Sequence, residues 1–135
     1  MQTDSLRDLI GIPFVDGGRD PNVGLDCWGL CRVVFRRCGV MVPDFPAACY
    51  DAIGIHMQIM DQSVTGHWAA LAVPDHVCLA VMAIDADAPH VCQHLGVYIG
   101  NGQIIHTLRK RHAHLIRVND RFFARKIRGF YRWIG

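Results

Sequence analysis

Cys27 is the residue of this sequence whose surroundings best suit nucleophilic chemistry. It opens an apolar stretch over residues 27–38 that predicts a helix, and Asp26 directly before it is a suitable N-cap. The free backbone N–H groups and the dipole of a helix N-terminus stabilise a thiolate, the nucleophilic form of cysteine. We therefore expect Cys27 to be rich in thiolate near neutral pH, with Cys49 as its main competitor for an alkylating agent. The alternative is a buried structural thiol, because many cysteines at helix starts only fill a core.

His94 and His106 are the candidate base and its orienting partner. They lie twelve residues apart on either side of Asn101-Gly102, a strong hairpin signal between two apolar runs. With the turn centred there, positions 97 and 106 are expected to pair, which leaves His94 about 10 Å away at the rise of a strand. A direct contact between the two rings would need a shifted register or a twist. We therefore predict that both histidines share one end of a site, where His106 can orient the base.

The elements that must position these residues follow from the hydrophobic pattern. We predict a short helix over residues 5–12, a loop of turn formers over 16–22, the helix over 27–38 and a second helix near 47–60. Residues 67–73 fit either a helix or a strand. After Pro74, apolar runs predict strands over 77–84, 92–99, 103–107, 115–118 and 127–134, with a helical turn over 120–126. Helices followed by antiparallel strands indicate an α+β fold, and 135 residues suit a single domain over 1–135.

The composition excludes several classes of protein. Hydrophobic residues make up 51% of the chain and charged residues 19%, so the chain can bury an ordinary core. The six cysteines form no CxxC pair, which argues against zinc-ribbon and thioredoxin-like sites. The first residues do not read as a signal peptide, and no apolar run approaches the roughly 20 residues of a membrane span. We therefore expect a protein made in the cytoplasm, with free thiols and no membrane span.

Charge is unevenly distributed along the chain. From Arg109 onward there are nine Lys/Arg and one acid, a net +8, which leaves −6 for the rest of a chain whose net charge is +2. Such a strip can meet nucleic acid or the anionic bacterial envelope, or it can be the solvated side of strands whose other side is core. No nucleic-acid motif is present, so a nucleic acid is not the expected partner. His112 and His114 could bind a metal, but a strand face or an exposed loop suits them better, so no metal is expected.

Two segments together match a known pattern. The first holds Gly17-Gly18 and then Gly24-Leu25-Asp26-Cys27-Trp28-Gly29-Leu30, and the second holds His94-Leu95-Gly96-Val97-Tyr98-Ile99-Gly100-Asn101-Gly102 with Ile105-His106. Their order and the spacing of the histidines resemble those of NlpC-type cell-wall peptidases, which are papain-like cysteine enzymes. The resemblance covers residues 12–38 and 91–107 and leaves residues 40–76 uncovered.

The resemblance implies a papain-like fold in which N-terminal helices pack on a C-terminal antiparallel sheet. It assigns Cys27 as nucleophile, His94 as base and His106 as the residue that orients the base. The backbone N–H of Cys27 would form part of an oxyanion hole. The substrate side would be lined by Asp26, Trp28 and Phe14. Family members cleave the bond between D-glutamate and a diamino acid in peptidoglycan stem peptides, so such a peptide is the expected partner, without a cofactor.

Two departures from the family pattern refine this expectation. Many members carry a tyrosine shortly before the Gly-Gly pair, whereas the nearest aromatic residue here is Phe14. The usual serine after the cysteine is Trp28, which resembles short phage-tail members of the family. We therefore expect phage tail proteins as partners and delivery to the cell envelope by a virion. Three alternatives stay open: an N-acetylmuramoyl-L-alanine amidase, a non-catalytic tail-assembly component with the same fold, and a nucleic-acid-binding module.

Overall fold

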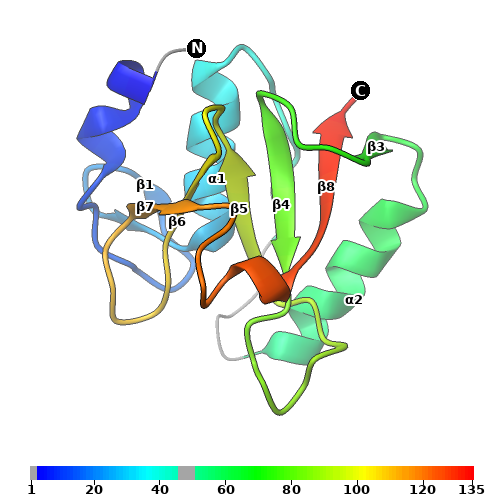
Figure 1. Ribbon diagram of the computed structural model, residues 1–135. Helices are drawn as coiled ribbons and strands as arrows, with labels where there is room; N and C mark the ends of the chain where they lie inside the picture. Colours follow the sequence, from blue (N-terminus) through cyan, green and yellow to red (C-terminus); the bar gives the residue numbers. More distant parts are fainter. Residues whose placement is uncertain (1–2, 46–50) are drawn as a thin grey trace.

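The computed structural model describes residues 3–45 and 51–135 of the chain. The two α-helices precede the six strands of the large sheet in the chain, as Figure 1 shows. In chain order they are η1 (Thr3–Leu9), β1 (Arg19–Asp20), β2 (Gly24–Leu25), α1 (Cys27–Arg37), α2 (Ala52–Ser63), β3 (Trp68–Leu71), β4 (Cys78–Met82), β5 (His94–Tyr98), β6 (Gln103–His106), β7 (His114–Arg117), η2 (Ala124–Lys126) and β8 (Ile127–Trp133).

Six strands form one antiparallel sheet in the order β3-β8-β4-β5-β6-β7. The predicted strands are confirmed, and β3 shows that the ambiguous segment after His67 is a strand. Both faces of the sheet are buried. One hydrophobic cluster includes Leu79, Val97 and Ile105 on one face, and a second includes Met82 and Ile104 on the other face. The α+β prediction is therefore confirmed.

Helix α1 covers one face of the sheet and lies behind β5 in Figure 1. The Asp26 side chain accepts a hydrogen bond from the Gly29 N–H at 2.7 Å, which confirms the predicted N-cap. The helix buries seven of its eleven residues, including Leu30, Val34 and Phe35, against the sheet. It ends before Gly39, whose φ of +80° is a conformation that suits glycine. This packing fixes Cys27 at the end of the helix nearest the start of β5.

The glycine-rich loop before α1 packs against the first turn of the helix. A methyl group on Gly29 would collide with the carbonyl oxygen of Gly18, and one on Gly18 would collide with the carbonyl oxygen of Gly24. Close backbone approach therefore explains glycine at positions 18 and 29. The approach brings Arg19 beside the N-cap, where its Nη1 donates to the Asp26 carboxylate at 2.6 Å.

The β5–β6 hairpin differs from its prediction by one residue. Val97 pairs with Ile105 rather than with position 106, and the loop comprises residues 100–102, all with positive φ. A register shift of one residue moves a side chain to the other face of a sheet. Under the observed register His94 and His106 share one face, whereas the predicted register would have placed them on opposite faces.

Two other predicted helices have different boundaries. Residues 3–9 form a 3₁₀ helix, with Leu6 and Leu9 buried, instead of a helix over 5–12. Helix α2 spans Ala52–Ser63, and the predicted start at position 47 lies outside the described residues. None of its side chains is fully buried, and Gln62 accepts a hydrogen bond from Trp68 Nε1 at 3.2 Å. Within residues 3–45 and 51–135, no helix combines the length and apolar character that a membrane crossing needs.

Candidate active site

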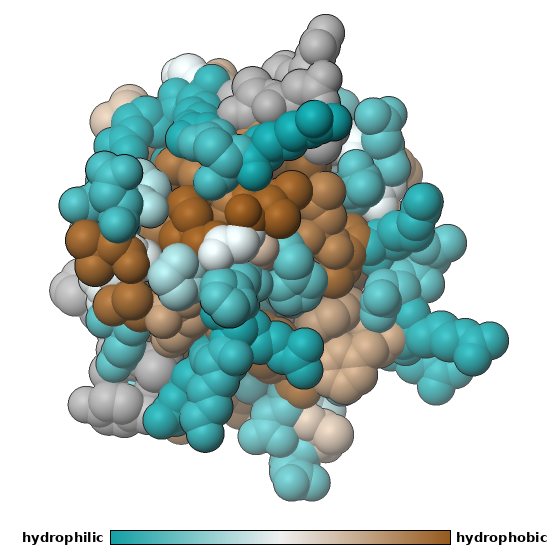
Figure 2. Space-filling model, turned by 90° about the vertical axis from the view of Figure 1, so that its left-hand side faces the viewer, coloured by the Kyte–Doolittle hydropathy of each residue, from teal (hydrophilic) through white to brown (hydrophobic). Residues whose placement is uncertain are grey.

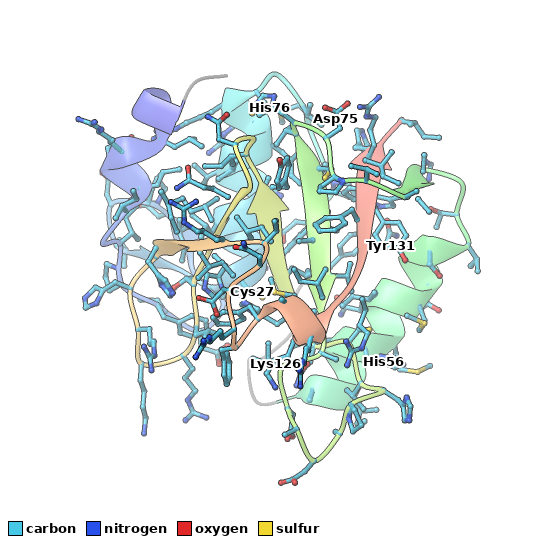
Figure 3. The ribbon with its side chains drawn as sticks, in the orientation of Figure 1. Cys27, His56, Asp75, His76, Lys126 and Tyr131 are labelled. Atoms are coloured by element: carbon cyan, nitrogen blue, oxygen red, sulfur yellow. The ribbon has the colours of Figure 1, made fainter. Side chains whose placement is uncertain are left out.

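A cavity of about 390 Å³ lies where the start of α1 meets the start of β5, and both Cys27 and His94 line it. Figure 3 shows Cys27 at that end of the sheet, with Tyr131 of β8 further along. The structure therefore brings the predicted nucleophile and base to one cavity. Its walls are mostly apolar and include Trp28, Ile55, Ile59, Trp68, Leu79, Val81, Ile84 and Tyr131, with Arg19, Arg109 and Arg128 as its cations.

Cys27 is half-buried, and its electrostatic surroundings differ from the prediction. Burial, and after it the Asp26 carboxylate, raise the pKa of the Cys27 thiol to about 12, although the backbone N–H groups of Leu95 and Trp28 oppose this. The expectation of a thiolate near neutral pH was therefore wrong, because desolvation outweighs the helix N-terminus. The resting residue is a thiol, which needs a base when it attacks.

His94 is buried, and its Nε2 lies 2.8 Å from Nδ1 of His106, within hydrogen-bond distance. This is the direct contact that the shifted register allows. Burial, followed by the charge of His114, lowers the pKa of His94 to about 3. Burial also lowers the pKa of His106 to about 2, with His94, His114 and Arg111 acting in the same direction. Both rings are therefore neutral near pH 7, as a general base must be.

His114 continues this contact and was missed as a site residue. It pairs directly with His106 across β6 and β7, and the two Nε2 atoms are 3.0 Å apart. The sequence shows His114 only as half of an HxH motif, and the favoured reading as a strand face is confirmed. Prediction of a hairpin between β6 and β7, with residues 107–113 as its loop, would have placed His114 opposite His106. No group of three His, Cys, Asp or Glu side chains suited to a metal occurs among the described residues.

The three positions predicted on the substrate side all line the cavity, but two of them also have structural tasks. Asp26 is buried, caps α1 and bonds Arg19, so its main contacts are within the protein. Trp28 donates from Nε1 to the carbonyl oxygen of Pro43 at 3.1 Å. Phe14 contributes a ring without a hydroxyl to the wall.

The described cysteines are free thiols, as predicted, and the basic strip lies at the protein surface. Cys27, Cys31, Cys38, Cys78 and Cys92 are free, and Cys49 lies outside the described residues. Every Lys/Arg from Arg109 onward is exposed except the half-buried Lys126, so the basic strip is a solvated surface. Figure 2 shows the face at the β7 edge, where hydrophilic side chains surround a smaller hydrophobic area.

Replacing Asp26 with asparagine is expected to lower the pKa of Cys27. The amide oxygen keeps the cap of α1, while the negative charge that raises the Cys27 pKa disappears and the nearby Arg19 charge is less opposed. The rate of Cys27 alkylation by iodoacetamide, measured by mass mapping between about pH 7 and pH 10, should rise at each pH. Asp51→Asn at the exposed cap of α2 is the matched control and should change nothing. An unchanged alkylation profile in Asp26→Asn would contradict the charge effect.

Residues 11–132 match the NlpC/P60 family. The chain belongs to this family. Its structural neighbours share the fold: NlpC1 from Trichomonas vaginalis superposes with a TM-score of 0.67 at 17% identity, covering 96% of this chain and 42% of that one. The NlpC/p60 domain of the peptidoglycan hydrolase SagA gives a TM-score of 0.59 at 21% identity, covering 95% and 92% of the two chains. The papain-like α+β fold is therefore confirmed.

A curated relative of this NlpC/P60 chain is the gamma-DL-glutamyl hydrolase of Bacillus subtilis (strain 168). It is 24% identical over 127 residues, which span 92% of this chain and 27% of the relative. This chain therefore corresponds to about a quarter of the length of that relative. The cavity is lined by Asp26 and Cys27 at the start of α1 and by His94, the first histidine of the β5–β6 hairpin.

Proposed function

We propose that this chain is a cysteine peptidase that hydrolyses the D-glutamyl–diamino acid bond of peptidoglycan stem peptides. The observation that carries the proposal is that Cys27, at the first turn of α1, and His94 line one cavity, while the His94 ring lies within hydrogen-bond distance of His106. A thiol beside an oriented neutral imidazole is the arrangement that nucleophilic catalysis requires.

In the proposed reaction His94 removes the Cys27 thiol proton as Sγ attacks the peptide carbonyl carbon. The backbone N–H of Cys27 has no acceptor within the helix, so it can stabilise the oxyanion of the tetrahedral intermediate. Collapse breaks the C–N bond, and His94 gives its proton to the leaving amine. Water, deprotonated by His94, then hydrolyses the thioester and restores the thiol. The high pKa of Cys27 makes the proton transfer to His94 part of the attack instead of a preceding step.

Two similarities support this substrate. NlpC/P60 neighbours include a domain of a peptidoglycan hydrolase, and the curated relative is a gamma-DL-glutamyl hydrolase. The proposal extends to delivery by a phage tail, as the Trp28 resemblance implies, and to peptidoglycan as the partner in the cell envelope.

The test is digestion of purified peptidoglycan by the wild-type protein, followed by mass spectrometry of the released fragments. A peptidase of the proposed specificity should create new amino termini on the diamino acid. Release of new L-alanine amino termini would instead show the amidase activity, for which the same cysteine and histidine could serve. The absence of any new terminus would support the non-catalytic tail component.

A further inference from the structure

We propose that His114 is a positioning residue that fixes the tautomer of His94 through His106, and the proposal rests on the proposed function of Cys27 and His94. The three rings form a chain of contacts: His94 Nε2 to His106 Nδ1 at 2.8 Å, then His106 Nε2 to His114 Nε2 at 3.0 Å. A further contact of 2.8 Å joins His114 Nδ1 to the carbonyl oxygen of His112. The chain therefore runs from the cavity to the backbone of the β6–β7 loop.

The carbonyl oxygen at the end of this chain sets the direction of every hydrogen bond in it. A carbonyl oxygen only accepts, so His114 Nδ1 must carry a proton and donate to His112. The neutral form of His114 has one donor and one acceptor nitrogen, and in that form its Nε2 accepts. The contact with His106 then requires the proton on His106 Nε2.

The same rule carries the direction on to His94. With its proton on Nε2, neutral His106 has a lone pair on Nδ1, which accepts from His94 Nε2. The proton of neutral His94 is thereby held on Nε2, and its Nδ1 keeps the lone pair. That lone pair is what the Cys27 thiol proton needs, because Nε2 of His94 is already engaged. A reversed chain would place a proton on Nδ1 and leave His94 without a free base nitrogen.

Packing holds the members of the chain in place. His94 and His106 are almost completely buried, and both rings are neutral for the desolvation reason given above. The Phe123 ring lies edge-on to His106 at 4.8 Å between centroids, and direct strand pairing sets His106 opposite His114. Beside His112, buried Ala113 donates to the carbonyl oxygen of Ile12 and its own carbonyl oxygen accepts from Gly11, both at 2.8 Å. The terminal carbonyl is therefore anchored to a fixed piece of backbone.

Two substitutions of His114 separate this role from simple packing. Leucine fills the space but cannot accept from His106 Nε2, so the chain loses the group that sets its direction. Glutamine can donate its amide to the His112 carbonyl and accept from His106, which restores that direction. The exposed His90, between β4 and β5, provides the matched control as His90→Leu.

The measurement is a long-range ¹H–¹⁵N correlation spectrum of the histidine rings, combined with kcat and KM on a stem peptide. In the wild type and in His114→Gln, His94 should be protonated at Nε2. In His114→Leu, a fraction of His94 should carry its proton on Nδ1, and kcat should fall roughly tenfold with KM changed less than about twofold. His90→Leu should match the wild type in both readouts.

A wild-type spectrum with His94 protonated at Nδ1 would overturn the proposal, even if His114→Leu fails to fold. An unchanged His94 tautomer and kcat in folded His114→Leu would overturn it as well. Equal loss of kcat in His114→Gln and His114→Leu, with His94 still protonated at Nε2 in both, would also show that packing alone matters. The tautomer is measured without substrate, so its outcome does not depend on activity. A protein with His94 protonated at Nε2 that cleaves no peptidoglycan would contradict the proposed function but not this inference.

Discussion

Replacing Cys27 with alanine is expected to lower the rate of peptidoglycan hydrolysis by at least about 10³-fold, because the only proposed nucleophile disappears. Cys27 is half-buried at the first turn of α1, and alanine is a good helix former of similar size. The free energy of unfolding should therefore change by less than about 1 kcal/mol. Turnover of muropeptides and thermal unfolding, measured on the same preparation, check both halves of this expectation.

Cys31→Ala is the matched control for Cys27→Ala. Cys31 lies one turn further along α1 and is only 1% exposed within the core cluster. Its replacement should cost about 1 kcal/mol of stability through the cavity it leaves, and it should keep the hydrolytic rate. Cys27→Ala should therefore lose activity and keep its stability, whereas Cys31→Ala should lose stability and keep its activity. If Cys27→Ala kept its activity, Cys27 would be a core thiol and the proposed function would be wrong.

Acid is expected to destabilise the folded domain strongly between pH 6.5 and pH 4. The folded-state pKa values of about 3 for His94 and about 2 for His106 lie below the ordinary value of 6.5. The unfolded chain therefore binds more protons in this range, so stability rises with pH and is lost as pH falls below about 6.5. One such histidine contributes a loss of roughly 3 kcal/mol by pH 4, a large part of the stability of an ordinary domain.

Urea unfolding followed by circular dichroism at pH 7, 5.5 and 4.5 measures this loss. His106→Gln should weaken the pH dependence, because it removes one depressed histidine and keeps an acceptor for His94 Nε2. The exposed His90 is again the control, since His90→Asn should leave the dependence unchanged. A free energy of unfolding that stays constant from pH 7 to pH 4.5 would mean that the two buried rings bind protons in the folded protein as readily as in the unfolded chain.

Local patterns in the sequence were enough to predict much of the fold. The Asp26 cap, the apolar helix after it and the apolar runs after Pro74 all depend on neighbouring residues, and their elements lie close to the predicted bounds. The hairpin register depended instead on the length of the loop, which is three residues rather than two. That single residue decides whether His94 and His106 share a face, so their contact could not be predicted.

Two features of the candidate site depend on contacts that no local pattern reports. The pKa of Cys27 follows from burial under segments distant in sequence, and burial reversed the effect expected from the helix terminus. The position of His114 beside His106 follows from the pairing of β6 with β7. Motif reasoning found Cys27, His94 and His106 as candidates, whereas their protonation states required the packed structure.

The sheet order has a consequence for how the domain is made. Strand β8 is the last strand in the sequence, yet it lies between β3 and β4 and pairs with both (Figure 1). During synthesis the ribosome releases β3 and β4 long before residues 127–133, so both strands wait with open hydrogen-bonding edges. Unpaired edges of this kind attract other chains. Closure of the sheet on β8, and with it the placement of Tyr131 at the cavity wall, therefore follows the synthesis of all the other strands of the sheet.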